Sequence, residues 1–245
     1  MLIGTASVDD LARGVTTINA WRDEPVKLDG VEIVQAMFEL PYAAREAVLP
    51  PALHPTNPPT MVLQAWRCLE SPWGAFELAM VRVQCRSGLR PRGFVVSSVI
   101  DNDAAARGLA AGWGLAPISG EVRVRRFYDA TTVDVVVAHR TILQLRGADP
   151  DPLDAGDVNY SSTLNLAHTP NGLRLVQLDV AADLDRVERM HFEAVTFDAA
   201  GWGTPALAPR QTVSASVGVG RLALERVRYC CKPDVLAFEG TETIS

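Results

Sequence analysis

The chain contains many short segments with the residue pattern of β-strands and few with the pattern of helices. The strand-like segments are rich in β-branched and aromatic residues, and loops containing Pro, Gly, Asn or Asp separate them. Strands are predicted at residues 31–40, 61–69, 75–85, 93–100, 121–128, 131–145, 158–168, 172–180, 186–197 and 212–230. Short helices are predicted at 41–49 and 103–111. This order of elements predicts a mostly β protein.

The 245 residues contain no internal repeat and no linker, so we expect one domain spanning 1–245. Residues 1–30 lack a clear period and are predicted to form an irregular N-terminal arm, and 147–157 are predicted to form a loop. Asn171-Gly172 is a strong hairpin signal. Many strands in succession favour an antiparallel sheet that curls into a barrel or cone.

Charge and cysteine content narrow the class of partner. The net charge is −6 and no basic stripe is present, so we expect no nucleic-acid partner. No apolar run is long enough to span a membrane, and the N-terminus does not resemble a signal peptide. The four cysteines have no metal-site spacing, so we expect reduced thiols, a cytoplasmic location and neither metal nor cofactor.

Several stretches resemble the acetoacetate decarboxylase family and keep its order and spacing from about residue 30 to residue 235. They are Leu49–Leu53 after the first helix, Asp101-Asn102 with Ala106–Leu109 and Gly112-Trp113, and Val158–Tyr160 with Gly172–Leu178. The resemblance implies a barrel-like cone with an internal cavity and a homo-oligomeric assembly. It also implies a small carbonyl compound or carboxylic acid as ligand.

The chain departs from this family where the family's chemistry is carried out. The family's catalytic lysine falls in the loop after the second predicted helix, and the matching positions hold Gly114, Leu115 or Ala116. Only two of the 23 basic residues are lysines: Lys27 precedes the matching region, and Lys232 lies beyond the last long predicted strand. The family's early active-site arginine is also missing. A Schiff base, which requires an amine, is therefore not expected.

Glu77 is the candidate catalytic residue, because it lies close to where the family places a carboxylate. It shares strand parity with Ala79, Val81 and Val83, and burial on an apolar face raises the pKa of a carboxyl group. A group with a raised pKa is suited to proton transfer. The alternative is an ordinary glutamate at a strand end, paired with an arginine. If Glu77 is catalytic, Glu77→Gln should abolish turnover and preserve the fold.

The candidate substrate-binding residues are implied by the resemblance. They are Ser97, Ser98, Trp113, Gly114, Leu115 and Ala116. The serine hydroxyls would orient a substrate, although serines in strands are more often only tolerated. Trp113 would form a wall, although a tryptophan beside glycines is more often a packing residue. Small or apolar side chains at 114–116 predict a cavity that accepts bulkier and less polar ligands than acetoacetate.

Three functions remain open at this stage. The first is an enzyme that acts on a β-keto acid, a polyketide-like molecule or a related carbonyl compound. Its reaction would be a dehydration, an isomerisation, a cyclisation or a lyase reaction that does not use a Schiff base. The second is a binding protein without catalysis, and the third is a structural subunit of an active paralogue. Polar groups converging in an apolar cavity would favour the first. A purely apolar cavity would favour the second, and a filled cavity the third.

Overall fold

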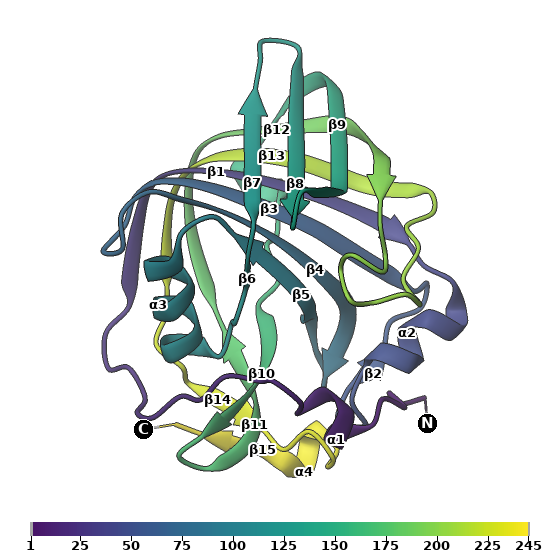
Figure 1. Cartoon of the computed structure of the whole chain (residues 1–245), viewed down its shortest axis with the longest axis vertical. Helices are drawn as coiled ribbons and strands as arrows, with labels where there is room; N and C mark the ends of the chain where they lie inside the picture. The colour runs from purple at the N-terminus through teal and green to yellow at the C-terminus, as the bar shows by residue number, and fades with distance from the viewer. Residues whose placement is uncertain (1, 245) are drawn as a thin grey trace.

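The computed structural model describes residues 2–244 and is dominated by one sheet of 15 strands (Figure 1). The first strands are β1 (Val26–Glu39), β2 (His54–Pro55), β3 (Thr60–Glu70), β4 (Phe76–Ser87), β5 (Arg90–Ile100), β6 (Ile118–Ser119), β7 (Glu121–Arg126) and β8 (Ala130–Val137). They are followed by β9 (Arg140–Leu153), β10 (Thr163–Thr169), β11 (Gly172–Leu178), β12 (Val180–Phe197), β13 (Thr212–Leu224), β14 (Tyr229–Cys231) and β15 (Thr241–Thr243).

The helices are few and short. They are α1 (Val8–Leu11), α2 (Tyr42–Val48), α3 (Asp103–Trp113), α4 (Ala237–Gly240) and the single 3₁₀ turn η1 (Ala155–Asp157). Strand makes up 54% of the chain and helix 12%, so the prediction of a mostly β fold is confirmed. The helices α2 and α3 correspond to the two predicted from the sequence.

The strands form an open path in the order β15-β14-β11-β10-β5-β4-β3-β1-β13-β12-β9-β8-β7. Nearly all pairings are antiparallel, but β5 pairs in parallel with β10 and with β6. The long strands arch over the molecule in Figure 1. Among the described residues the path ends at β15 and β7, which do not pair with each other, so a closed barrel or cone is not confirmed.

Both faces of the central strands are buried, each against a different core. On β4, Val81 and Val83 face a core that β7, β8 and β9 complete. Leu78 and Met80, which have the opposite parity, face a second core that includes α3. Alternate residues of a strand point to opposite sides, which is why one segment supplies both cores.

The helix α3 begins as the sequence predicts and ends two residues later than predicted. The side chain of Asn102 accepts hydrogen bonds from the backbone N–H groups of Ala104 and Ala105. The C-terminal cap is Gly114, with φ of 70°. A Cβ atom at Gly114 would lie 2.7 Å from the Cβ of Ala167, so both the backbone conformation and the space require glycine.

Several predicted boundaries were wrong. Residues 131–145 form a hairpin rather than one strand, because Ala138 and His139 adopt positive φ angles of 48° and 63° and reverse the chain. The strand β9 then continues to Leu153, so most of the expected loop at 147–157 is paired with β12. The irregular arm ends at Val26, where β1 begins, and it contains α1. The strand predicted at 212–230 is interrupted, because β13 ends at Leu224.

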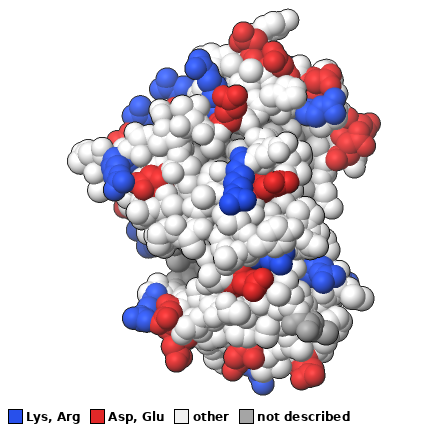
Figure 2. Space-filling view, turned by 90° about the vertical axis from the view of Figure 1, so that its right-hand side faces the viewer, with Lys and Arg blue, Asp and Glu red and all other residues white. Residues whose placement is uncertain are grey.

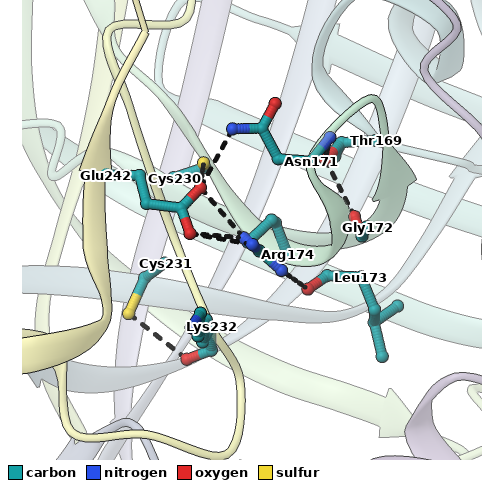
Figure 3. A network of polar contacts seen from close by, with 9 residues as sticks. All are labelled: Thr169, Asn171, Gly172, Leu173, Arg174, Cys230, Cys231, Lys232 and Glu242. Atoms are coloured by element: carbon teal, nitrogen blue, oxygen red, sulfur yellow. Dashed lines mark hydrogen bonds and ion pairs between the residues drawn. The ribbon is translucent and has the colours of Figure 1, made fainter.

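The C-terminal strands are attached to the β10–β11 hairpin by a polar network (Figure 3). The guanidinium of Arg174 donates from Nη2 and Nε to the carboxylate of Glu242, at 2.8 and 3.2 Å. The side-chain amide of Asn171 donates to the same carboxylate at 3.0 Å. These hydrogen bonds hold the pKa of Glu242 below its usual value, with Arg174 as the largest cause. The network therefore joins β15 to a hairpin about 70 residues earlier.

Charged side chains are mixed by sign on the face that Figure 2 shows, where basic groups lie next to acidic ones. Oppositely charged side chains also form exposed ion pairs in this chain, such as Arg189 with Asp151 and Arg221 with Asp183. That face therefore presents no basic stripe of the kind that nucleic acids require. Within residues 2–244, no helix has both the length and the apolar character needed to cross a membrane.

Candidate functional site

A cavity of about 250 Å³ lies at the edge of β5, between the loop that follows α3 and the N-terminal arm. β5 pairs with β10 at Gly93 and Phe94, and with β6 at Val99 and Ile100. Residues 95–98 lie between these two pairings and line the cavity. A register shift of β5 against β4 in this stretch bends the strand there. The site is thus a gap in the sheet between β6 and β10.

Three uncharged polar residues line this cavity. Ser97 is half-buried, while Ser98 is 5% exposed and Asn165 is 2% exposed. The Nδ2 group of Asn165 donates a hydrogen bond to the backbone oxygen of Trp113 at 3.1 Å. The Oδ1 atom of Asn165 is buried and has no hydrogen-bond partner among the described residues. An unpartnered buried acceptor costs free energy unless a ligand or a water molecule supplies a donor.

The loop after α3 forms an apolar wall of the cavity. Gly114, Leu115 and Ala116 all line it, and Leu115 is 1% exposed. Phe94 and Leu166 add further apolar surface. The structure therefore brings together two of the sequence-derived groups, the serines of β5 and the loop residues 114–116, although they are separated along the chain by α3.

The N-terminal arm covers another side of the cavity through residues 11 and 13–15. The arm is fixed on both sides of this stretch. The backbone N–H of Ala6 donates to the oxygen of Leu49 at 3.0 Å, and the N–H of His168 donates to the oxygen of Thr16 at 2.9 Å. Arg13 is the one ionisable residue among those lining the cavity, and its exposed side chain pairs with Asp10.

Trp113 lies in the second core and does not line the cavity. Its side chain is fully buried, and its Nε1–H donates to the backbone oxygen of Glu225 at 2.7 Å. The ring of Trp73 packs edge-on against it, with ring centroids 6.5 Å apart. In this position Trp113 contributes packing, which is the alternative that the sequence left open.

Glu77 lies on the face that its parity predicts, but it does not line this cavity. Its Oε2 atom accepts a hydrogen bond from the backbone N–H of Val124 on β7, and its Oε1 atom lies 3.8 Å from Nε of Arg67. Arg67 also donates to Glu32 at 3.2 Å. Burial raises the pKa of Glu77, the Val124 N–H opposes this, and the nearby charge of Asp101 adds to it.

The sequence reasoning missed Asn165 and the contribution of the N-terminal arm. Asn165 stands between Leu164 and Leu166 in β10, and such alternation by itself predicts a polar residue on an exposed face, whereas Asn165 is buried. The arm gave no signal either, because its contact with the cavity depends on backbone hydrogen bonds to distant segments.

No family model matches the chain, and no curated protein sequence matches it. Its structure, however, is that of the acetoacetate decarboxylase fold. The acetoacetate decarboxylase of Legionella pneumophila matches with a TM-score of 0.73 and 16% identity, over 84% of this chain and 87% of that chain. The resemblance seen in the sequence is thereby confirmed for the fold.

Two enzymes that share this fold carry other names. The enduracididine biosynthesis enzyme MppR in complex with pyruvate matches with a TM-score of 0.66 and 15% identity, over 92% of this chain and 93% of that chain. An acetoacetate decarboxylase-like enzyme from Sphingomonas wittichii RW1 matches with a TM-score of 0.66 and 13% identity, over 84% and 92% of the two chains.

We expect Glu77→Gln to be at least as stable as the wild type at pH 7.5. The pKa of Glu77 is raised in the folded protein. Its favourable contribution to the free energy of unfolding is therefore complete below the pKa that Glu77 has in the unfolded chain. That contribution is lost as pH rises through the pKa that Glu77 has in the folded protein. A neutral glutamine can still accept the hydrogen bond from Val124, and Arg67 keeps Glu32.

Urea unfolding at pH 4, 5.5 and 7.5 measures this effect. The difference in free energy of unfolding between Glu77→Gln and the wild type should disappear towards pH 4, where the carboxyl group of Glu77 is also neutral. A variant that is less stable at pH 7.5 would show that the attraction of Arg67 outweighs the cost of burial.

Proposed function

We propose that the chain binds a small carbonyl compound carrying a carboxylate, such as a β-keto acid or a related molecule, in the cavity at the edge of β5. The observation that carries this proposal is a cavity lined by Ser97, Ser98 and Asn165, whose Oδ1 is unpartnered, together with several apolar residues. A few polar groups in an apolar cavity are typical of small-molecule sites. The complex of MppR with pyruvate supports this ligand class.

Each polar group has a distinct part in this proposal. The hydroxyl groups of Ser97 and Ser98 donate to the carbonyl or carboxylate oxygens of the ligand. The Oδ1 atom of Asn165 can only accept, so it favours a ligand form with a hydroxyl, such as an enol. A volume of about 250 Å³ lies below the usual range for drug-sized ligands and therefore favours a compact molecule.

The same cavity favours binding over acid–base catalysis. It is lined by no histidine, lysine or carboxylate among the described residues, and Arg13 is exposed and paired. A proton-transfer group has to reach the substrate within hydrogen-bond distance. Polar groups in the cavity were expected to favour an enzyme, but serine and asparagine side chains are poor proton-transfer groups near neutral pH. Binding without catalysis is therefore our first candidate. A homo-oligomer that carries one such cavity in each subunit is part of the proposal.

An enzyme without a Schiff base is the second candidate. It is favoured by the raised pKa of Glu77 and by the likeness to enzymes of this fold. In this form the hydroxyl groups polarise the ligand carbonyl, and Glu77 on β4 acts as the acid or base once it is released from the Val124 N–H of β7. Loss of turnover in Glu77→Gln, with ligand binding retained, would distinguish this candidate from binding alone.

Mass spectrometry of small molecules that co-purify with the protein, followed by calorimetric titration of acetoacetate and pyruvate, tests the proposal. Asn165→Leu and Ser98→Val are each expected to weaken binding about tenfold, since each removes one buried hydrogen bond to the ligand. Ser214→Val is the matched control, because Ser214 is exposed on β13 and lies outside the cavity. Equal affinities in all three variants would contradict the proposed site.

Borohydride reduction in the presence of acetoacetate or pyruvate should give no covalent adduct on either lysine. Lys27 and Lys232 are both exposed, and neither lines the cavity, so neither amine is desolvated in the way that Schiff-base chemistry requires. Peptide mass mapping after reduction measures the outcome. An adduct on Lys27 or Lys232 would restore a decarboxylase or aldolase mechanism.

A further inference from the structure

The two most buried polar residues that line the cavity at β5 are uncharged. Ser98 is 5% exposed and Asn165 is 2% exposed, and neither side chain can neutralise a carboxylate. Taking a carboxylate out of water without a positive partner is costly. A ligand that carries a carboxylate therefore has to place that group where the cavity offers a cation or remains open to water.

Arg13 of the N-terminal arm is the one charged residue that lines the cavity among residues 2–244. Its side chain is 77% exposed, so it lies at the mouth of the cavity rather than at the buried end. Leu11 and Val15, two positions to either side of it, also line the cavity and pack against the hydrophobic core. The arm then runs alongside β10, where Thr17 pairs with His168 (Figure 1). These contacts hold the backbone of Arg13 beside the opening.

The present partner of Arg13 is easily exchanged. Its Nη2 contacts Oδ1 of Asp10, whose side chain is 62% exposed, and water and salt screen a pair between two such groups. Gly14, the next residue, has φ of 80°, and no atom lies within 4 Å of the position that a Cβ would take. The backbone beside Arg13 is therefore not confined by neighbouring atoms.

We propose that Arg13 binds the carboxylate of the ligand at the mouth of the β5 cavity and exchanges Asp10 for it. This inference rests on the proposed function and names the residue that selects a charged ligand. A guanidinium matches a planar carboxylate with two parallel N–H donors. The carbonyl end of the ligand then points towards Ser98 and Asn165. Because one ion pair replaces another, the exchange itself costs little, and the arm sets a preference for an anion over a neutral molecule of the same size.

Calorimetric titration of the full chain with acetoacetate and with its neutral analogue acetoacetamide tests this role. Arg13→Met should weaken acetoacetate binding about tenfold, since it removes a charge-assisted hydrogen bond, and should change acetoacetamide binding less than about twofold. Arg13→Lys should recover part of the loss. Arg221→Met is the matched control, because Arg221 is also exposed and paired but does not line the cavity.

Asp10→Asn should act in the opposite direction and strengthen acetoacetate binding about twofold, because the competitor for Arg13 is removed. Asp9→Asn makes the same charge change on α1 at a residue that does not pair with Arg13, so it should have a smaller effect. The gain from Asp10→Asn should vanish when it is combined with Arg13→Met. A gain that persists in the double variant would show that only the net charge near the cavity matters.

The outcomes separate the role of Arg13 from the proposed function. If Ser98→Val weakens acetoacetate binding and Arg13→Met does not, the cavity binds the ligand and the role of Arg13 is overturned. Equal weakening of acetoacetate and acetoacetamide in Arg13→Met would also overturn it, because the effect would then not depend on the carboxylate. A wild-type protein that binds neither compound would contradict the proposed function itself.

Discussion

Trp113→Ala is expected to lower the free energy of unfolding by about 3–5 kcal/mol, the usual range for a large aromatic residue in a well-packed core. Trp113 is fully buried, its Nε1–H donates to the Glu225 oxygen at 2.7 Å, and its ring packs against Trp73. Alanine would leave a cavity beneath α3 and an unpaired backbone oxygen at Glu225. Urea unfolding followed by far-ultraviolet circular dichroism measures the change.

Trp113→Phe separates the loss of apolar packing from the loss of the hydrogen bond to Glu225. It keeps most of the apolar contact and removes the hydrogen bond, so we expect a loss of about 1–2 kcal/mol. Because Trp113 does not line the cavity at β5, the phenylalanine variant should bind the cavity ligand with unchanged affinity. A stable Trp113→Ala protein with altered ligand selectivity would instead place the indole at the ligand.

Glu188→Gln is expected to cost about 3 kcal/mol, because it breaks an ion pair that is almost completely buried. The carboxylate of Glu188 on β12 is 5% exposed, and Nη2 of Arg126 on β7 lies 2.6 Å from it. Arg186 forms a second ion pair with the same carboxylate. The pair with Arg126 joins β7, the end strand of the sheet, to the long strand β12. Equilibrium urea unfolding measures the loss.

Asp151→Asn provides a matched control, because Asp151 on β9 pairs with Arg189, the residue that follows Glu188 on β12. Asp151 and Arg189 have the same separation of 2.6 Å, but each side chain is 60% exposed. Water and salt screen such a pair, so its loss should cost at most about 1 kcal/mol. Equal effects of Glu188→Gln and Asp151→Asn would show that burial adds nothing to the Glu188 pair.

Local patterns in the sequence were sufficient to place most of the long strands and the two longer helices. The alternation of Ala79, Val81 and Val83 with Leu78 and Met80 requires two buried faces, and the structure has a core on each. Asn102 marks the start of α3 through its side chain. The absence of an amine at 114–116 is likewise a property of the sequence alone. Each of these inferences depends on neighbours within a few residues.

The hairpin turn at Ala138-His139 could not be predicted in this way. Neither residue is typical of a turn with positive φ, and the pairing of β8 with β9 holds them in that conformation. The long extension of β9 to Leu153 depends in the same manner on its pairing with β12. Tertiary pairing therefore overrides weak local preference at these positions.

The candidate sites depend even more on the tertiary structure. The sequence suggested Ser97, Ser98 and residues 114–116 through a family resemblance, but only the parallel pairings of β5 leave the gap in which they meet Asn165. The sequence by itself determined the strand periodicity and the missing amine, since both are local. Sheet order and register decided which distant side chains share a cavity, because they alone set the distances between residues far apart along the chain.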